Sequence, residues 1–473
     1  MAAPLPDEDP RLSLWLRVRT YAVPPRMIDT AEARRRVGDW AGACAAAGVD
    51  PHPALAPRRL ARTRGRALAD AVRADLRAIA PDLLRWHFPR SAPHGLLRPG
   101  LTLALARYRV DGATGGADGP GRTLWLTART APARAAGPQR LTLALWDPTG
   151  PAPDTDGTDE ARAHPDARFR LDLHRHLWDA DRAPELRSRT GVDTPPDRRS
   201  VPGPTLGPPD PWLAVDRWAD EAALLSRDAG RPAPGPVLVR AGTGRRLLLH
   251  PPGTPGEAPR ARLLGPRETP PPGVPVLPEA AVRTLPDLVL LRSGLIAPDR
   301  LHPLVAAALA PPGDPGDPGG GRRRADDPVT AARTVDCRGA RHRLGLVDGV
   351  LTPLDHDPEE LRRERLLADL TGPPLPCLRM VAEVHRSPER LPDVRERLRH
   401  GDVTGALDVV EGLLGPAAAL ADGPLREALR GAVDDRLRHG LYRAGLDRTG
   451  PPPAPRPGSP SARAARRRSH ALA

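Results

Sequence analysis

The sequence predicts an α+β protein: an N-terminal antiparallel sheet with helices, proline-rich linkers and a helical C-terminal domain. Residues 101–110, 122–130 and 140–147 are strand candidates separated by Gly-rich or Pro-rich turns, which is typical of an antiparallel meander. Residues 358–445 are expected to form four or five helices. Strands are thus grouped before helices and do not alternate with them, which favours α+β over α/β.

Before the meander, one strand and two helical stretches are expected. Residues 12–19 alternate, with leucines on one face and Trp15 on the other, which predicts a strand. Asp29-Thr30-Ala31-Glu32 has the form of a capping box and predicts the start of a helix. Residues 55–87 carry apolar side chains near helical spacing, and residues 169–174 are a candidate fourth strand of the meander.

Beyond the meander, proline-rich runs divide the chain. Residues 211–227 predict a helix, residues 237–250 a short hairpin around Gly242-Thr243-Gly244, and residues 334–354 further strands. The expected organisation is an α+β domain with a Trp-bearing sheet (1–189), a proline-rich middle with a short hairpin and helices (190–328), a small sheet plus helical domain (329–448) and a disordered basic tail (449–473).

Two short segments resemble each other. Gly38-Asp39 and Gly401-Asp402 each follow an Arg-rich helical stretch, and a second glycine follows three residues after the aspartate, at 42 and 405. Glycine can end one helix in the left-handed conformation and aspartate can cap the next. Each segment therefore predicts a tight helical hairpin.

Composition excludes several chemistries. All 71 basic residues are arginine, and lysine and asparagine are absent. Schiff-base and pyridoxal-phosphate enzymes need a lysine amine, as do the Walker loop and the kinase phosphate site. N-glycosylation needs asparagine. We therefore expect no cofactor from these classes.

The net charge of +13 makes nucleic acid a possible partner. Arg58, Arg59, Arg62 and Arg66 form the densest basic cluster, and on one continuous helix Arg58, Arg62 and Arg66 would share a face able to contact phosphates. The alternative is an ordinary solvated face opposite the apolar side chains.

A metal site is a second possibility. Cys337, His342 and His356 lie within twenty residues, and the spacing of the first two suits one half of a zinc site. The alternative is a core cysteine beside solvent-exposed histidines. His174 and His176, near the end of the meander, would share a face if the strand continued, but a strand-to-helix corner is favoured there.

The tryptophans suggest a third possibility. Trp15, Trp125 and Trp146 each lie opposite a row of leucines in a predicted strand, so together they could form a stacking platform for a ligand. The alternative is that helices cover this face.

No motif identifies an activity, so the leading expectation is a non-catalytic cytoplasmic accessory subunit that binds another protein. The alternatives are a nucleic-acid-binding protein that uses the arginine cluster and the basic tail, and a metal-dependent enzyme built on Cys337, His342 and His356. No run of apolar residues is long enough to cross a membrane, so no membrane partner is expected.

Overall fold

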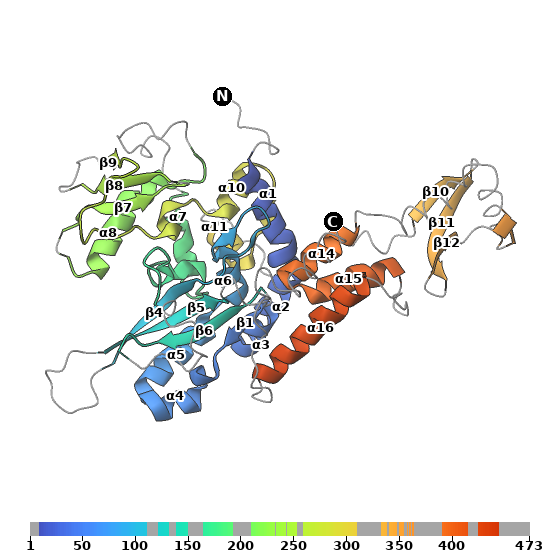
Figure 1. Cartoon of the computed structure of the whole chain (residues 1–473), viewed down its shortest axis with the longest axis horizontal. Helices are drawn as coiled ribbons and strands as arrows, with labels where there is room; N and C mark the ends of the chain where they lie inside the picture. Colours follow the sequence, from blue (N-terminus) through green and yellow to red (C-terminus); the bar gives the residue numbers. More distant parts are fainter. Residues whose placement is uncertain are drawn as a thin grey trace, which may run out of the picture. The chain divides into compact units, whose positions relative to one another are not determined.

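The computed structural model describes residues 9–110, 122–131, 139–149, 164–192, 210–231, 233–242, 244–252, 259–309, 333–337, 340–347, 350–353, 357, 359–360, 362–363, 390–414 and 424–443. The chain forms two compact units, one of residues 1–135 and 139–316 and one of residues 136–138 and 317–473. Helices are combined with antiparallel and mixed sheets, which confirms the predicted α+β class (Figure 1). None of the helices within the described ranges has both the length and the apolar character needed to span a bilayer.

The predicted meander is present. Strands β4 (Thr102–Val110), β5 (Arg122–Thr130) and β6 (Leu141–Trp146) pair antiparallel in that order. The neighbour of β6 is β1 (Val49–Pro51), which pairs parallel to it and completes a sheet of order β1-β6-β5-β4.

Residues 169–174 do not add a strand. Residues Leu171–Leu173 form a 3-10 helix, η5, and Arg170 makes only an isolated bridge to Ala104 of β4. The strand prediction for these residues is wrong because a short segment with several apolar side chains fits a buried helical turn as well as a strand. Here the indole of Trp178 donates to the carbonyl oxygen of Leu171 (3.0 Å), which holds the turn in place.

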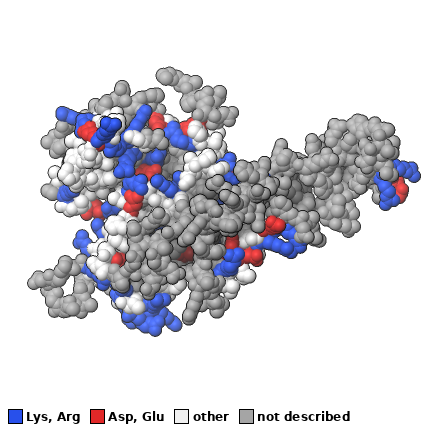
Figure 2. All heavy atoms as spheres, in the orientation of Figure 1, with Lys and Arg blue, Asp and Glu red and all other residues white. Residues whose placement is uncertain are grey.

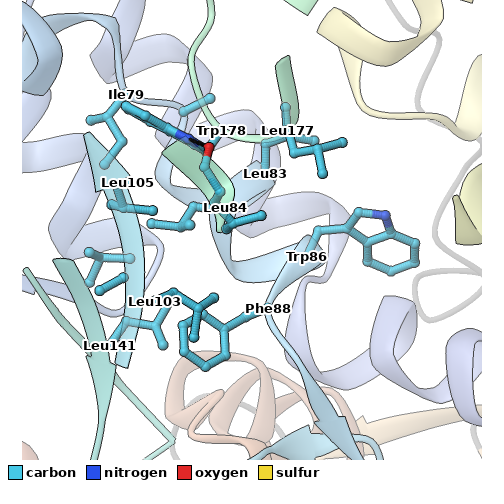
Figure 3. Packing of buried hydrophobic residues seen from close by; sticks show 14 of the residues in the cluster. Ile79, Leu83, Leu84, Trp86, Phe88, Leu103, Leu105, Leu141, Leu177 and Trp178 are labelled. Carbon is cyan, nitrogen blue, oxygen red and sulfur yellow. Dashed lines mark hydrogen bonds between the residues drawn. The ribbon is translucent and has the colours of Figure 1, made fainter. Parts of the chain in front are cut away.

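Helices supply the other side of the core. The predicted helical stretch 55–87 is divided into α4 (Pro57–Arg64), α5 (Arg66–Ala78) and α6 (Pro81–His87). Figure 3 shows side chains from α6 and β4 packed together with Trp178. The fully buried members include Leu83 and Leu84 of α6 and Leu103 and Leu105 of β4.

The N-terminal segment corrects the prediction of a strand over residues 12–19. It forms α1 (Pro10–Arg17), followed by a π-helical turn, η2 (Val18–Ala22). Asp9 accepts a hydrogen bond from the Arg11 amide (2.9 Å) and Pro10 occupies the first helical position, so a helix start precedes the alternating leucines. Leu12, Trp15 and Leu16 then pack against the core at helical spacing.

Helix α2 (Pro25–Arg36) begins four residues before the expected capping box at Asp29. Pro25 occupies its first position, and no side chain caps it. The Thr30 hydroxyl instead donates to the Arg26 carbonyl oxygen one turn earlier (2.8 Å), so the capping-box prediction is wrong although the helix exists.

A second sheet lies in the same unit. Strands β7 (Val237–Arg240), β8 (Arg246–His250) and β9 (Arg260–Leu263) pair antiparallel, which confirms the predicted hairpin and extends it. Helix α8 (Trp218–Asp228) packs on this sheet through Trp218, Ala222 and Leu225.

The remaining elements of this unit beyond those named above are mostly short. They are β2 (Arg90–Ser91), β3 (Leu96–Leu97), η6 (Arg175–Leu177), η7 (Ala183–Glu185), α7 (Leu186–Thr190), η9 (Val215–Arg217), α9 (Glu279–Val282), α10 (Pro286–Arg292), η10 (Pro298–Arg300) and α11 (Pro303–Leu309).

The second unit contains the predicted C-terminal strands, and its described ranges include helices of the expected C-terminal set. Strands β10 (Arg333–Cys337), β11 (Ala340–Val347) and β12 (Val350–Pro353) form an antiparallel sheet. Helices α14 (Arg390–His400), α15 (Val403–Leu414) and α16 (Pro424–Arg443) share a small core of Val394, Ala406, Val410 and Leu429.

Both predicted helical hairpins are confirmed. Gly38 ends α2 with φ +79°, and Asp39 accepts a hydrogen bond from the Gly42 amide (2.9 Å) at the start of α3 (Trp40–Ala46). Between α14 and α15, Gly401 has φ +81°. Asp402 there accepts from the Gly405 amide at the same 2.9 Å. The two segments therefore use one capping geometry twice.

Candidate functional site

The tryptophan platform is not assembled as expected. Trp15 lies on helix α1, where its ring is 5.2 Å from that of Trp86, so it does not belong to the sheet. Trp125 and Trp146 are direct partners in the register of β5 and β6 and do share one face. The structure thus brings two of the three tryptophans together and separates the third.

Arginine side chains cover the ring of Trp125. The guanidinium carbons of Arg107 and Arg170 lie 5.7 and 5.3 Å from the ring centroid. Asp228, at the end of α8, accepts hydrogen bonds from both arginines (2.7 and 2.8 Å), which fixes them over the indole. A ligand could stack on Trp125 only after displacing these guanidinium groups.

The N-terminal arginine cluster is divided between two helices. Arg58, Arg59 and Arg62 are exposed on α4, whereas Arg66 begins α5 after Gly65, whose φ is +95°. Figure 2 shows basic side chains gathered where α4 lies in Figure 1. Because Gly65 breaks the helix, Arg66 does not continue the face formed by Arg58 and Arg62, and the expectation of one continuous stripe is wrong.

Only part of the predicted metal set falls within the described residues. Cys337 pairs with Ala340, and His342 pairs with Val335, in the β10–β11 hairpin. The side chains of Cys337 and His342, the whole of His356 and the tail 449–473 lie outside the described part of the chain. These sites stay predictions.

A different buried cluster has atoms close enough to share a ligand. Glu32 of α2, Asp82 of α6 and His302, which precedes α11, have ligand atoms within 4.8 Å of one another. Arg35 donates two hydrogen bonds of 2.8 Å to Glu32, and His302 Nε2 lies 2.8 Å from Asp82 Oδ2, whereas the buried Asp82 Oδ1 has no hydrogen-bond partner among the described residues. Burial opposes ionisation of Glu32, but the Arg35 hydrogen bonds and the His302 charge outweigh it and lower its pKa. The cluster is therefore a buried junction of α2, α6 and the residue that precedes α11.

A cavity of about 280 Å³ beside the β7–β8 hairpin is strongly basic. We call it the arginine pocket. It is lined by Arg98, Arg168, Arg240, Gly242, Gly244, Arg245, Arg246, Val276, Leu277, Glu279, Val282 and Arg283.

Backbone contacts bring its distant parts together. The Glu279 amide at the start of α9 donates to the Arg168 carbonyl oxygen (2.8 Å), and the Leu277 amide donates to the Leu238 carbonyl oxygen of β7 (2.8 Å). Gly242 and Gly244 form the hairpin turn with φ values of +72° and +80°, which favour glycine. The turn is followed by strand β8, as expected for a hairpin and not for a dinucleotide-binding loop.

Charge in the arginine pocket is unbalanced. Six arginines face a single carboxylate, Glu279, which already binds Arg283 (3.0 Å). Arg168 binds Asp166, and Arg246 donates to two backbone carbonyl groups. Arg98 and Arg240 are exposed, and no side-chain hydrogen bond joins either guanidinium group to a described residue, although the charge of Arg240 helps to lower the pKa of Asp166. These two guanidinium groups are therefore available to an anion.

Sequence reasoning missed this pocket. Its arginines come from residues 98, 168, 240–246 and 283, so no local cluster signals it. The one local signal was Gly242-Thr243-Gly244, which correctly predicted a turn but said nothing about the charges around it.

Comparison with known proteins does not assign a family. No family model matches the chain, and no curated protein or solved structure is detectably similar to it. The function must therefore be inferred from the side chains described above.

Proposed function

We propose that this protein is a non-catalytic accessory protein that binds an acidic segment of a partner protein in the arginine pocket. The observation that carries the proposal is that the lining holds six arginines and one carboxylate, with Arg98 and Arg240 exposed and their side chains not hydrogen-bonded to any described residue. The planar guanidinium group suits bidentate hydrogen bonding to Asp and Glu carboxylates. A cytoplasmic location is part of this proposal.

The chemistry of the lining supports binding over catalysis. Its described residues include arginines, glycines, apolar side chains and Glu279, and none of them is a histidine, serine or cysteine. Glu279 is already engaged by Arg283. A general base or nucleophile needs a titratable group free to reach the substrate, and this lining offers none.

The same lining supports an acidic peptide over nucleic acid. No aromatic ring is among the described residues that line the pocket, so it has no surface on which a base could stack. Trp125, the candidate stacking residue, already has Arg107 and Arg170 at its ring. The carboxylates of an acidic peptide can bind to the guanidinium groups without an aromatic surface.

Fluorescence anisotropy with a labelled glutamate-rich peptide tests the proposal. The double variant Arg98→Gln/Arg240→Gln should weaken binding at least about tenfold, since a hydrogen bond to a charged group contributes about 1.5–3 kcal/mol. The matched control, Arg58→Gln/Arg59→Gln on α4, removes the same charge elsewhere and should leave affinity nearly unchanged. Equal weakening by both variants, or by neither, contradicts the proposal.

Nucleic-acid binding stays the second candidate because Arg58, Arg59 and Arg62 are exposed together on α4. A labelled single-stranded oligonucleotide in the same assay distinguishes the two. Binding that the α4 control abolishes, with a steep dependence on salt, would support this alternative.

A further inference from the structure

A second cavity of the same unit, of about 250 Å³, contains the buried histidines near the end of the meander. We call it the histidine cavity. His174 precedes η6 and His176 lies within it, Arg217 belongs to η9 and Glu221 to α8. Apolar side chains of the 213–215 segment and of α10 complete the lining. It shares only Arg283 with the arginine pocket.

A buried ion network forms the floor of this cavity. Arg189 donates to both oxygens of Glu221 (2.9 Å each), and His174 Nε2 lies 3.0 Å from the same carboxylate. His174 Nδ1 lies 3.0 Å from the Arg170 carbonyl oxygen. Both ring nitrogens thus lie within hydrogen-bond distance of an oxygen atom of the protein.

The ionised carboxylate completes the network. Burial alone would raise the pKa of Glu221, but the His174 hydrogen bond and the charges of His174 and Arg189 outweigh burial and lower it. Glu221, His174 and Arg189 are therefore hydrogen-bonded to one another, and this network does not by itself indicate a ligand.

Two other buried nitrogens of the lining are not satisfied. His176 is 4% exposed, and its Nδ1 has no hydrogen-bond partner among the residues that the structure describes. Arg217 donates from Nη1 to the Ser188 carbonyl oxygen (2.9 Å), but its Nε has no partner within the same residues. Buried polar atoms are nearly always hydrogen-bonded, so these two atoms indicate a missing partner.

The chemistry of that partner follows from the two nitrogens and their surroundings. Arg217 Nε–H can only donate, so the partner must present an acceptor. Burial, and then the charges of His174 and Arg189, hold the pKa of His176 well below its ordinary value, so its neutral ring has one nitrogen that donates and one that accepts.

The charge of the lining favours an anion. Four arginines outnumber the three carboxylates of the lining; Asp210 binds Arg11 (2.9 Å), Glu221 binds Arg189, and Arg283 binds Glu279 outside the lining. Leu213, Leu285 and Leu288 provide an apolar wall. The volume lies just below the range of about 300–1,000 Å³ typical of drug-sized ligands, which suits a smaller molecule.

We propose that the histidine cavity binds a small organic carboxylate, with its carboxylate on Arg217 Nε and His176 and its hydrocarbon part against the leucines. Such a ligand supplies the acceptor that Arg217 lacks, compensates the excess positive charge and fills the apolar side of the cavity. This site is independent of the proposed accessory function, because the two unsatisfied nitrogens do not line the arginine pocket.

Isothermal titration of the full-length protein with hexanoate, with hexanamide as its uncharged match, tests the proposal. Hexanoate should bind with a dissociation constant in the millimolar range or below, and hexanamide at least about tenfold more weakly. Inorganic phosphate forms a third arm. Phosphate binding without hexanoate binding would overturn the carboxylate assignment.

Variants then locate the site. Arg217→Gln should weaken hexanoate binding at least about tenfold, whereas Arg227→Gln, an exposed arginine on the same helix-forming segment, should leave it unchanged. Hexanoate should also shift the imidazole NMR signals of His176 in the unmodified protein, which tests the site without relying on a variant that folds. The proposal would be refuted if hexanoate bound with unchanged affinity to Arg217→Gln and did not shift the His176 signals. It would also be refuted if hexanoate did not bind at about 10 mM.

Discussion

Replacing Gly42 by alanine tests the capping geometry of the α2–α3 hairpin. A Cβ atom built on Gly42 would lie 2.1 Å from Asp39 Oδ2 and 2.7 Å from Asp39 Cγ, far inside van der Waals contact. The Asp39 side chain would have to rotate away, and its hydrogen bond to the residue 42 amide (2.9 Å) would be lost. The substitution therefore acts through Asp39.

Two opposing terms set the magnitude. Losing an aspartate N-cap costs about 0.5–2 kcal/mol of folding free energy. Alanine in place of glycine inside a helix returns about 1 kcal/mol. Gly42→Ala alone should therefore change stability little or destabilise the first unit slightly. In an Asp39→Ala background, where no cap remains to be lost, the same change should stabilise it by about 1 kcal/mol.

Urea unfolding of the four proteins of this cycle, followed by α-helical circular dichroism, measures the coupling between Asp39 and Gly42. The expected coupling energy equals the lost cap energy, about 0.5–2 kcal/mol. Asp39→Asn is the control, because asparagine caps as well as aspartate and should retain most of the stability. A Gly42→Ala effect that is the same with and without Asp39 would refute the reasoning.

The α14–α15 hairpin has the same capping geometry and allows the test to be repeated in the same protein. A Cβ on Gly405 would lie 2.1 Å from Asp402 Oδ2, so the cycle of Asp402 and Gly405 should give a coupling of the same sign in the second unit. Opposite signs at the two hairpins would contradict the shared geometry.

Three further predictions concern stability. Burial, with the charges of His302 and Arg90, lowers the pKa of His87 to about 3, so the unfolded chain binds more protons than the folded one below about pH 6.5. The stability that depends on neutral His87 is therefore fully present above about pH 6.5 and is lost on acidification by up to about 1.4 kcal/mol per pH unit. His87→Gln should flatten the dependence of the urea-unfolding free energy on pH between 7 and 5. An unchanged slope would contradict this. The pKa of His176 is lowered in the same way, so His176→Gln should also flatten the slope, and an unchanged slope would contradict this. Asp82→Ala should remove about 3–5 kcal/mol because it leaves His302 without its buried partner, against less than about 0.5 kcal/mol for exposed Asp181→Ala; similar losses in both would argue against the helix junction.

Local chemistry explains what the sequence predicted well. The two helical hairpins depend on a glycine and an aspartate within six residues, so each could be recognised without knowing the fold. The meander strands were predicted to within about two residues because their turns are rich in Gly or Pro.

Competing local signals explain the errors. Residues 12–19 alternate as a strand would, but Asp9 and Pro10 start a helix just before them, and Leu12, Trp15 and Leu16 also fit helical spacing. Moving Trp15 from the sheet to a helix also removed it from the expected tryptophan platform. In the same way, Gly65 separates α4 from α5 and so removes Arg66 from the expected arginine stripe.

Tertiary contacts explain why the candidate sites were not predicted. Arg98 and Arg240 are more than a hundred residues apart, and the contacts between the Arg168 carbonyl group and the Glu279 amide that help to build their pocket are between backbone atoms. Backbone pairing of this kind leaves no residue-type pattern in the sequence. The same holds for the contact between His174 and Glu221, since only the fold brings those positions together.

Hydrogen–deuterium exchange with and without a saturating glutamate-rich peptide tests the proposed function most directly, because it locates the bound surface without any substitution. The arginine pocket predicts slower exchange of the amides in residues 240–246 and 276–283, with residues 58–66 of α4 and α5 unchanged. Protection confined to residues 58–66, or no protection anywhere at saturation, would contradict it.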